Sequence, residues 1–198
     1  LMRCCEKVLD IVTVNLLFVV SCLPIVTIGV AKISLYQTIF EVKRSRRIPV
    51  FKIYIRAFKQ NLKLGFQLGL LELGIFLISV VDLSLFWSQT GVAFQLIKAI
   101  CLGILIFLTL VMLASYPIAA RYQLTWKEVL QKGLLLVSFN FVWFFLMLAI
   151  ILLIIMLLYL SGFTLVLGGS AFLLIGFGLL AFCQAGLMEK LFAKYQAD

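Results

Sequence analysis

The chain alternates between long apolar runs and short polar connections. Five runs are each long enough to cross a hydrocarbon core of about 30 Å as a helix. Their approximate bounds are residues 11–30, 62–85, 92–116, 134–160 and 163–187. The pattern therefore predicts an all-α integral membrane protein, with about five transmembrane helices in a single membrane domain that covers residues 1–198.

The first run contains two residues that disturb a helix. Pro24 lacks a backbone N–H, and Gly29 loosens the backbone a little more than one turn later. A kinked transmembrane span and a re-entrant element both fit this pattern, and the sequence favours the kinked span. With five spans and a cytoplasmic C-terminus, the N-terminus would lie outside, whereas a re-entrant first run would place both termini inside.

A basic connection, residues 31–61, separates the first two runs and contains an amphipathic segment. From residue 51 onward, apolar side chains recur at every third or fourth position beside a stripe of basic side chains. The apolar stripe is Phe51, Tyr54, Ile55, Phe58 and Leu62, and the basic stripe is Lys52, Arg56, Lys59 and Lys63. A helix with two such faces suits the headgroup region of an anionic leaflet. We predict an interfacial helix that contacts anionic lipid or a partner protein through Phe51, Tyr54, Phe58 and the basic stripe.

Composition and charge agree with a membrane protein of defined orientation. Hydrophobic residues make up 65% of the chain, and the mean hydropathy is +1.21. The net charge is +9, and nine of the 17 Lys and Arg residues lie between Lys32 and Lys63. Such clustering is typical of cytoplasmic loops and not of a nucleic-acid surface, so no nucleic acid is expected as a partner. Connections 31–61 and 118–133 and the C-terminus are predicted to face the cytoplasm of a multi-pass protein of the cell membrane.

Residues that could carry chemistry are few. The chain has no histidine, its five cysteines form no CxxC pair, and no phosphate-binding P-loop is present, so we expect no enzyme, cofactor or metal site. Glu72 is a carboxylate within the second apolar run, on one stripe with Gly65 and Gly69. Such a group either couples transport to a proton or cation, or forms hydrogen bonds across a helix interface. Candidate polar partners are Asn15, Asn140 and Gln184, and Asn15 and Asn140 complete the candidate intramembrane polar site with Glu72.

The first third of the chain resembles a known family. Asn15-Leu16-Leu17, the stretch from Cys22 to Gly29 (CLPIVTIG) and Phe58-Lys59-Gln60-Asn61 are similar to the YesL-like family of bacterial multi-pass membrane proteins, a domain of unknown function. The resemblance implies a protein found mostly in Gram-positive bacteria and made alongside ABC importers for oligosaccharides and glycans. It implies no catalytic residues. Only Tyr36 represents the tyrosine-rich continuation of the family motif.

This resemblance leads to a functional expectation with alternatives. We expect an accessory membrane subunit that associates with the permease subunits of a carbohydrate ABC importer, and indirectly with its ATPase. An independent secondary carrier or channel for a small solute is the main alternative, and a membrane adaptor or sensor without transport activity is another. A carrier is expected to have broken helices around a polar cluster at the membrane midplane, and Pro24 and Glu72 are the features that favour one.

Overall fold

The computed structural model describes residues 2–45, 49–87 and 91–196. Arg46 and Arg47 of the basic connection and the turn residues 88–90 lie outside the described residues. The described chain is helical throughout apart from short turns, and it contains no strand, so the all-α membrane fold is confirmed. Its helices are α1 (Met2–Ser21), the 3-10 turn η1 (Ile25–Thr27), α2 (Ile28–Arg44), α3 (Val50–Gln60), α4 (Leu62–Phe86), α5 (Val92–Arg121), α6 (Trp126–Phe139), α7 (Phe141–Leu158), α8 (Gly162–Ala171), the π-helical turn η2 (Phe172–Gly176) and α9 (Phe177–Gln196).

Five helical segments of the described chain are long and apolar enough to cross a membrane. They are Ile25–Arg44, Leu62–Leu85, Val92–Arg121, Phe141–Leu158 and Leu165–Phe192. Four of these segments overlap the last four predicted runs. The first does not match its prediction, because it shares only residues 25–30 with the expected 11–30 run and continues to Arg44, within the segment assigned to the polar connection.

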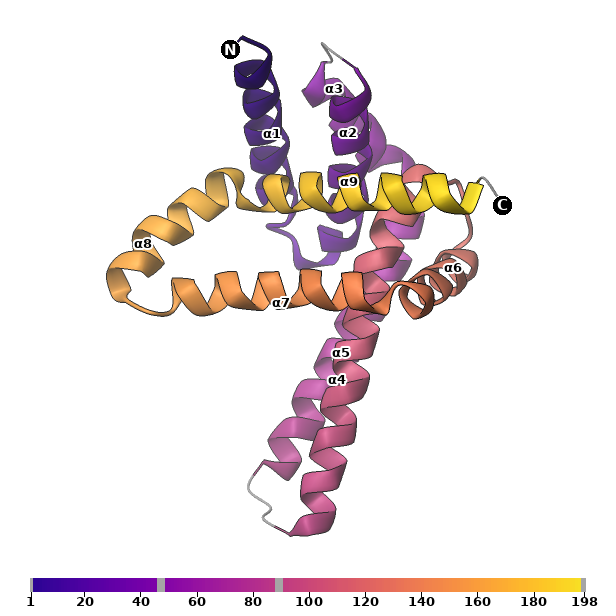
Figure 1. The fold of residues 1–198 in the computed structure, drawn as a ribbon, viewed down its shortest axis with the longest axis vertical. Helices are drawn as coiled ribbons and strands as arrows, with labels where there is room; N and C mark the ends of the chain where they lie inside the picture. The colour runs from indigo at the N-terminus through magenta and orange to yellow at the C-terminus, as the bar shows by residue number, and fades with distance from the viewer. Residues whose placement is uncertain (1, 46–48, 88–90, 197–198) are drawn as a thin grey trace.

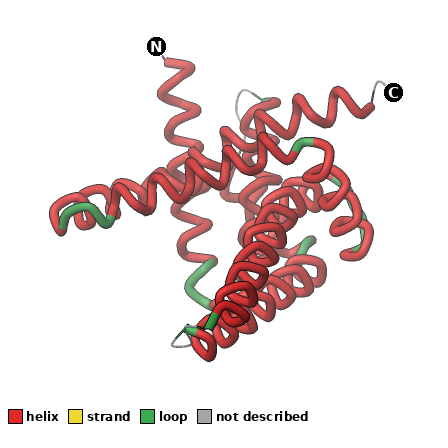
Figure 2. The backbone as a smooth tube through the Cα atoms, turned by 60° about the horizontal axis from the view of Figure 1, so that its bottom comes forward, coloured by secondary structure: helices red, strands yellow, loops and turns green. Residues whose placement is uncertain are grey.

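The reason for this shift is a helical hairpin centred on Pro24. Helix α1 ends at Ser21, and Pro24 precedes η1 with an extended backbone that directs the chain into α2. The two helices run side by side in opposite directions (Figures 1 and 2). The favoured kinked span over residues 11–30 is therefore wrong, since the run consists of two antiparallel helices. The start of α1 and the end of α2 consequently lie on the same side of the molecule (Figures 1 and 2).

Gly29 has a different role from the predicted helix break. It lies in the first turn of α2, is buried, and packs against Gly65 and Gly69 of α4. A Cβ atom on Gly29 would lie 2.2 Å from the carbonyl oxygen of Gly65 and 2.7 Å from the Cα of Gly69. The stripe of small residues on α4 therefore permits a close helix crossing, and the helix that uses it is α2 of the same chain.

Helix α2 is the centre of the fold. It contacts α1, α3, α4, α5 and α9, and eleven of its residues are buried. At its C-terminal end, the ammonium group of Lys43 lies 3.1 Å from the carboxylate of Glu189 on α9. The guanidinium of Arg121, at the end of α5, lies 4.8 Å from the ring centre of Phe192 on α9. The C-terminal ends of α2, α5 and α9 are therefore gathered on one side.

Two long hairpins project from this centre. Helices α4 and α5 extend together to one end of the molecule, and α7, α8 and α9 extend sideways across that direction (Figure 1). Phe144 is the one buried residue of α7, all of whose residues are described. The projecting helices expose apolar side chains over most of their surface, as expected for helices that contact lipid or the helices of another protein.

The last two predicted runs are also interrupted. The run 134–160 is divided at Asn140, which separates α6 from α7. Helix α6 begins earlier than predicted because Thr125 and Glu128 form a capping box, in which each side chain accepts a hydrogen bond from the backbone of the other residue. The run 163–187 contains the π-helical turn η2 between α8 and α9. Helical structure therefore extends into the connection 118–133.

Candidate functional site

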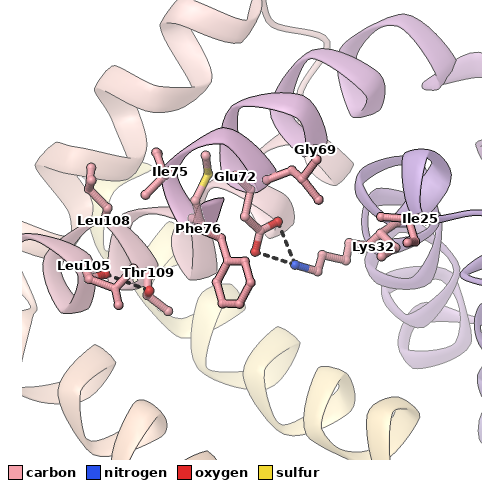
Figure 3. A pocket seen from close by; sticks show the side chains of 12 residues that line it. Ile25, Lys32, Gly69, Glu72, Ile75, Phe76, Leu105, Leu108 and Thr109 are labelled. Atoms are coloured by element: carbon pink, nitrogen blue, oxygen red, sulfur yellow. Dashed lines mark hydrogen bonds and ion pairs between the residues drawn. The ribbon is translucent and has the colours of Figure 1, made fainter. Parts of the chain in front are cut away.

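Lys32 of α2 and Glu72 of α4 form an ion pair within the bundle. The Lys32 ammonium lies 2.6 Å from Oε1 of Glu72 and 2.8 Å from Oε2. The two side chains extend toward each other between their helices (Figure 3). Both retain about a third of their side-chain surface, 29% for Lys32 and 34% for Glu72. Each charge thus has an opposite charge in contact, which offsets much of the cost of placing it at the depth of an apolar run.

Two tyrosines make hydrogen bonds beside this pair, and the two sets of contacts, which line one cavity, are together called the polar network. The Tyr116 hydroxyl of α5 donates a hydrogen bond to Oε2 of Glu72, and its ring lies 4.7 Å from the Lys32 ammonium. One turn beyond Lys32, the buried Tyr36 hydroxyl donates to Oε1 of Gln184 on α9 at 2.5 Å. The Gln184 amide in turn donates to the Leu113 carbonyl at 2.7 Å. The network therefore links α2 to α4, α5 and α9 through groups whose hydrogen bonds are made inside the bundle.

Cavities lie on two sides of the ion pair. A cavity of about 360 Å³ is lined by Lys32 and Glu72 together with apolar residues of η1, α2, α4 and α5. Its walls include Ile25, Gly69, Phe76 and Leu105, seen close by in Figure 3. A second cavity of about 420 Å³, toward α7 and α9, is lined by the same pair with Tyr36, Tyr116 and Gln184. Both are lined mostly by apolar side chains, so the polar network is a small charged group between two apolar spaces.

The sequence predicted that Asn15 and Asn140 form one polar site with Glu72, but neither residue lies in the polar network. Asn15 of α1 is buried, donates to the Leu173 carbonyl at 2.6 Å and accepts from the Gly178 amide at 2.7 Å. It thereby pairs a carbonyl within the π-helical turn and an amide just after it, where the helical hydrogen-bond ladder is interrupted. Asn140 stands between α6 and α7 and donates to the Leu136 carbonyl at 3.2 Å. Of the proposed polar partners, Gln184 is the one that lies in the network with Glu72.

The amphipathic helix is present as α3, with a different division of its faces. Val50, Tyr54 and Ala57 form the buried side, which packs against α1 and α2. Phe51, Ile55 and Leu62 of the predicted apolar stripe are exposed, with 60% of Phe51 accessible, and Phe58 is half-buried. The four basic residues Lys52, Arg56, Lys59 and Lys63 are all exposed. Burial raises the pKa of the Tyr54 phenol, so this side chain is neutral where it anchors α3.

Sequence reasoning missed Lys32, Tyr36 and Tyr116 as members of the polar network. Lys32 was assigned to the polar connection because the first span was placed too early. The available signal was the spacing of Lys32 and Tyr36, which lie one turn apart and so share a face of α2. With the span at Ile25–Arg44, that spacing places a cation and a phenol inside the bundle, where a carboxylate such as Glu72 is the expected partner.

Comparison with known proteins supports the resemblance over part of the chain. Residues 11–83 match a family described as a protein of unknown function, DUF624. Over that region the chain is similar to this family, in agreement with the resemblance found in its first third. The matched region includes both Lys32 and Glu72, whereas Tyr116 and Gln184 lie beyond it. No curated protein and no solved structure matches the chain.

Proposed function

We propose that the protein is an accessory membrane subunit of a carbohydrate ABC importer, which binds the permease subunits through the exposed face of α3. The observation that carries this proposal is the division of α3 into an anchored face and a basic face. Tyr54 and Ala57 attach the helix to α1 and α2, while Lys52, Arg56 and Lys59 face outward from a surface whose position the bundle determines. A preorganised charged surface loses little conformational entropy when a partner binds.

The charge distribution supports an orientation for this surface. Lys43 at the end of α2 and Arg121 at the end of α5 both lie against the C-terminal half of α9. This clustering of positive charge supports a cytoplasmic location for α3. The partner would thus meet α3 at the cytoplasmic edge of the permease, near the level of the lipid headgroups.

The ion pair supports a structural role for Glu72 within such a subunit. Lys32 and Tyr116 hold both carboxylate oxygens, so the charge of Glu72 is compensated where it stands. A carboxylate that binds and releases protons during transport must lose these partners in part of its cycle. The static arrangement favours a clamp between α2, α4 and α5, which keeps the bundle rigid behind α3.

A second candidate function is a secondary carrier for a small solute. It is favoured by the cavities of about 360 Å³ and about 420 Å³ that adjoin the same ion pair. Opening of the Lys32–Glu72 contact would join the two spaces, as a gate would in alternating access. The mostly apolar lining fits a hydrophobic solute better than a carbohydrate, so this candidate requires a substrate class other than sugars.

Co-purification with permease subunits tests the accessory role. In cells that express the importer, the variant Arg56→Gln/Lys59→Gln should insert and accumulate normally but should lose the permease subunits in mild detergent, together with uptake of the carbohydrate. A matched control is Arg44→Gln/Lys190→Gln, which removes one arginine and one lysine from exposed positions outside α3. If the α3 variant retains as much of the permease subunits as the control does, or if both lose them equally, α3 would be ruled out as the specific contact. Purification of the unmodified chain without any permease subunit would refute the accessory role itself.

A further inference from the structure

A large polar cleft lies at the junction of the two basic connections. It has a volume of about 990 Å³. One wall consists of Gln37 on α2 and of residues 60–67, where α3 passes into α4. The other wall is the segment 119–128, from the last turn of α5 to the first turn of α6. The cleft is separate from the cavities beside the ion pair and from the outward face of α3.

The lining of the cleft is positively charged. Lys63, Arg121 and Lys127 contribute three cations. Glu128 is the one carboxylate among the lining residues, all of which are described, and its Oε2 accepts a hydrogen bond from the Thr125 backbone at 3.0 Å. The N-terminal end of α6 adds the positive end of a helix dipole. The field in the cleft therefore favours an anion.

Uncharged donors surround these cations. Gln60, Gln67 and Gln123 bring side-chain amides to the lining, and Asn61 is held in place by its hydrogen bond to Oε1 of Gln37 at 2.8 Å. Amide and cationic donors together match the several acceptor oxygens of a phosphate group. This donor set fits a phosphate ester with hydroxyl groups nearby better than it fits a simple monatomic anion.

Two of the helices that line the cleft carry exposed leucines two turns farther along. On α4, Leu70 lies two turns beyond Lys63 and is 53% exposed. On α6, Leu134 lies two turns beyond Lys127 and is 46% exposed. The cleft lies at the end of α4, a candidate membrane span, and exposed leucines lie farther along α4 and α6, so that a polar and an apolar region follow one another in the order of a lipid headgroup and its acyl chains.

We propose that this cleft binds the headgroup of an anionic phospholipid. Its phosphate lies among Lys63, Arg121 and Lys127, the glutamine amides bind the hydroxyl groups of the headgroup, and the acyl chains follow the exposed surfaces of α4 and α6. The bound lipid bridges connections 31–61 and 118–133, which are distant in sequence. It is a ligand of the folded chain in addition to any partner at α3.

Native mass spectrometry of the full chain in a neutral detergent tests this site with short-chain phosphatidylglycerol and phosphatidylcholine. We expect phosphatidylglycerol to bind in preference to phosphatidylcholine. Replacement of two lysines in Lys63→Gln/Lys127→Gln should weaken phosphatidylglycerol binding by roughly 25-fold, about five-fold for each charge. The matched control Lys7→Gln/Lys190→Gln removes two exposed lysines that lie outside both the cleft and α3, and it should bind as the unmodified chain does.

The alternatives give different results. Equal weakening in both double variants would show that any surface charge suffices, and would overturn the site. Glycerol 3-phosphate could also compete with the bound lipid. If it displaces the lipid at concentrations as low as those at which unlabelled phosphatidylglycerol does, the cleft would be assigned to a soluble phosphate ester instead. A phosphatidylglycerol with a photoreactive headgroup, applied to the unmodified chain, should label peptides that contain residues 60–67 and 119–128. Labelling confined to other peptides would overturn the proposal without any reliance on variants.

Discussion

Gly29 of α2 and Gly65 of α4 touch so closely that a methyl group on Gly29 would lie 2.2 Å from the Gly65 carbonyl oxygen. No side chain moves aside to relieve this contact, because the neighbouring atoms belong to the backbones of Gly65 and Gly69. The crossing stands one turn from Lys32 on α2 and two turns from Glu72 on α4. The short distance between the helices is therefore what allows these two side chains to meet.

Replacement of Gly29 by alanine should destabilise the protein. The added methyl group forces α2 and α4 apart, and overpacking of this kind costs about 1–3 kcal/mol. Gly74→Ala is a matched control, because a Cβ at that position meets open space: beyond the adjoining backbone of α4, no atom of the described residues lies within 4 Å of it. The control should be neutral or stabilising by up to about 1 kcal/mol, the difference in helix propensity between the two residues. Unfolding by titration with dodecyl sulfate from a mild detergent measures both; equal stability of the two variants would contradict the close crossing.

The ion pair predicts a specific pattern of non-additivity. Lys32→Gln and Glu72→Gln should each destabilise the bundle, because each leaves the opposite charge without its partner at the depth of an apolar run. The double variant should be more stable than the sum of the single losses predicts, by a coupling free energy on the order of 2 kcal/mol. Additive losses in the same titration would show that the pair contributes nothing as a pair.

This expectation differs from the one that the sequence alone supports for Glu72. A lone carboxylate in an apolar run is relieved of a desolvation cost when it becomes an amide, so Glu72→Gln would then fold normally. The presence of Lys32 reverses the sign, because the amide leaves an ammonium group uncompensated. The sequence placed Glu72 on the correct face with Gly65 and Gly69, since helical spacing is a local property. It did not identify Lys32, because that required the position of the first span.

The first span illustrates why such errors arise. Hydropathy identifies how much apolar sequence is available, but it does not say where a helix ends. Pro24 was recognised as a break, yet a kink and a reversal of direction differ only in a few backbone dihedral angles at Cys22 to Pro24. The reversal is stabilised by contacts that are distant in sequence, such as those of α2 with α9. For the same reason, the burial of Asn15 beside Leu173 and Gly178 could not be anticipated from periodicity.

We expect the Asn15 side chain to stabilise the π-helical turn and the start of α9, because it makes a hydrogen bond to a backbone group of each. Asn15→Leu removes a donor to the Leu173 carbonyl and an acceptor for the Gly178 amide, and leaves both backbone groups buried without these partners. We expect a loss of about 1–3 kcal/mol for each group that remains unpaired. Hydrogen–deuterium exchange should rise at the Gly178 amide in this variant. Thr13→Val on the same helix is the control, because the Thr13 hydroxyl is exposed and bonds only within its own helix, to the Leu9 carbonyl.

The same exchange measurement distinguishes two explanations for Asn15. If Asn15 acts through its hydrogen bonds, Asn15→Asp should restore slow exchange at Gly178, because a neutral aspartic acid at this buried site still accepts a hydrogen bond from that amide and can donate one to the Leu173 carbonyl. Slow exchange in both Asn15→Leu and Asn15→Asp would mean that packing of α1 against η2 protects the amide without the side-chain bond.

The hairpin at Pro24 makes a prediction about the side of the membrane on which the chain begins. Because α1 and α2 are antiparallel, the start of α1 and the end of α2 lie toward the same side of the bundle, and the joined ends of α4 and α5 lie at the opposite end (Figures 1 and 2). Glu6 is in the first half of α1, Ser45 directly follows α2, and Gly91 directly precedes α5. Single cysteines at these positions, in a chain whose own cysteines are replaced, report their sides through an impermeant thiol reagent. Glu6→Cys removes an acidic residue, which has little influence on orientation.

In intact cells, the reagent should label Gly91→Cys and leave Glu6→Cys and Ser45→Cys unlabelled until the membrane is permeabilised. The physical reason for this expectation is that the positive charge of connection 31–61 favours a cytoplasmic location for the end of α2, and the hairpin brings the start of α1 back to the same side. Labelling of Ser45→Cys in intact cells would invert the whole orientation and move α3 out of reach of a cytoplasmic partner. Labelling of Glu6→Cys alone would mean that α1 crosses the membrane by itself in cells, and that the α1–α2 hairpin opens when the chain is inserted.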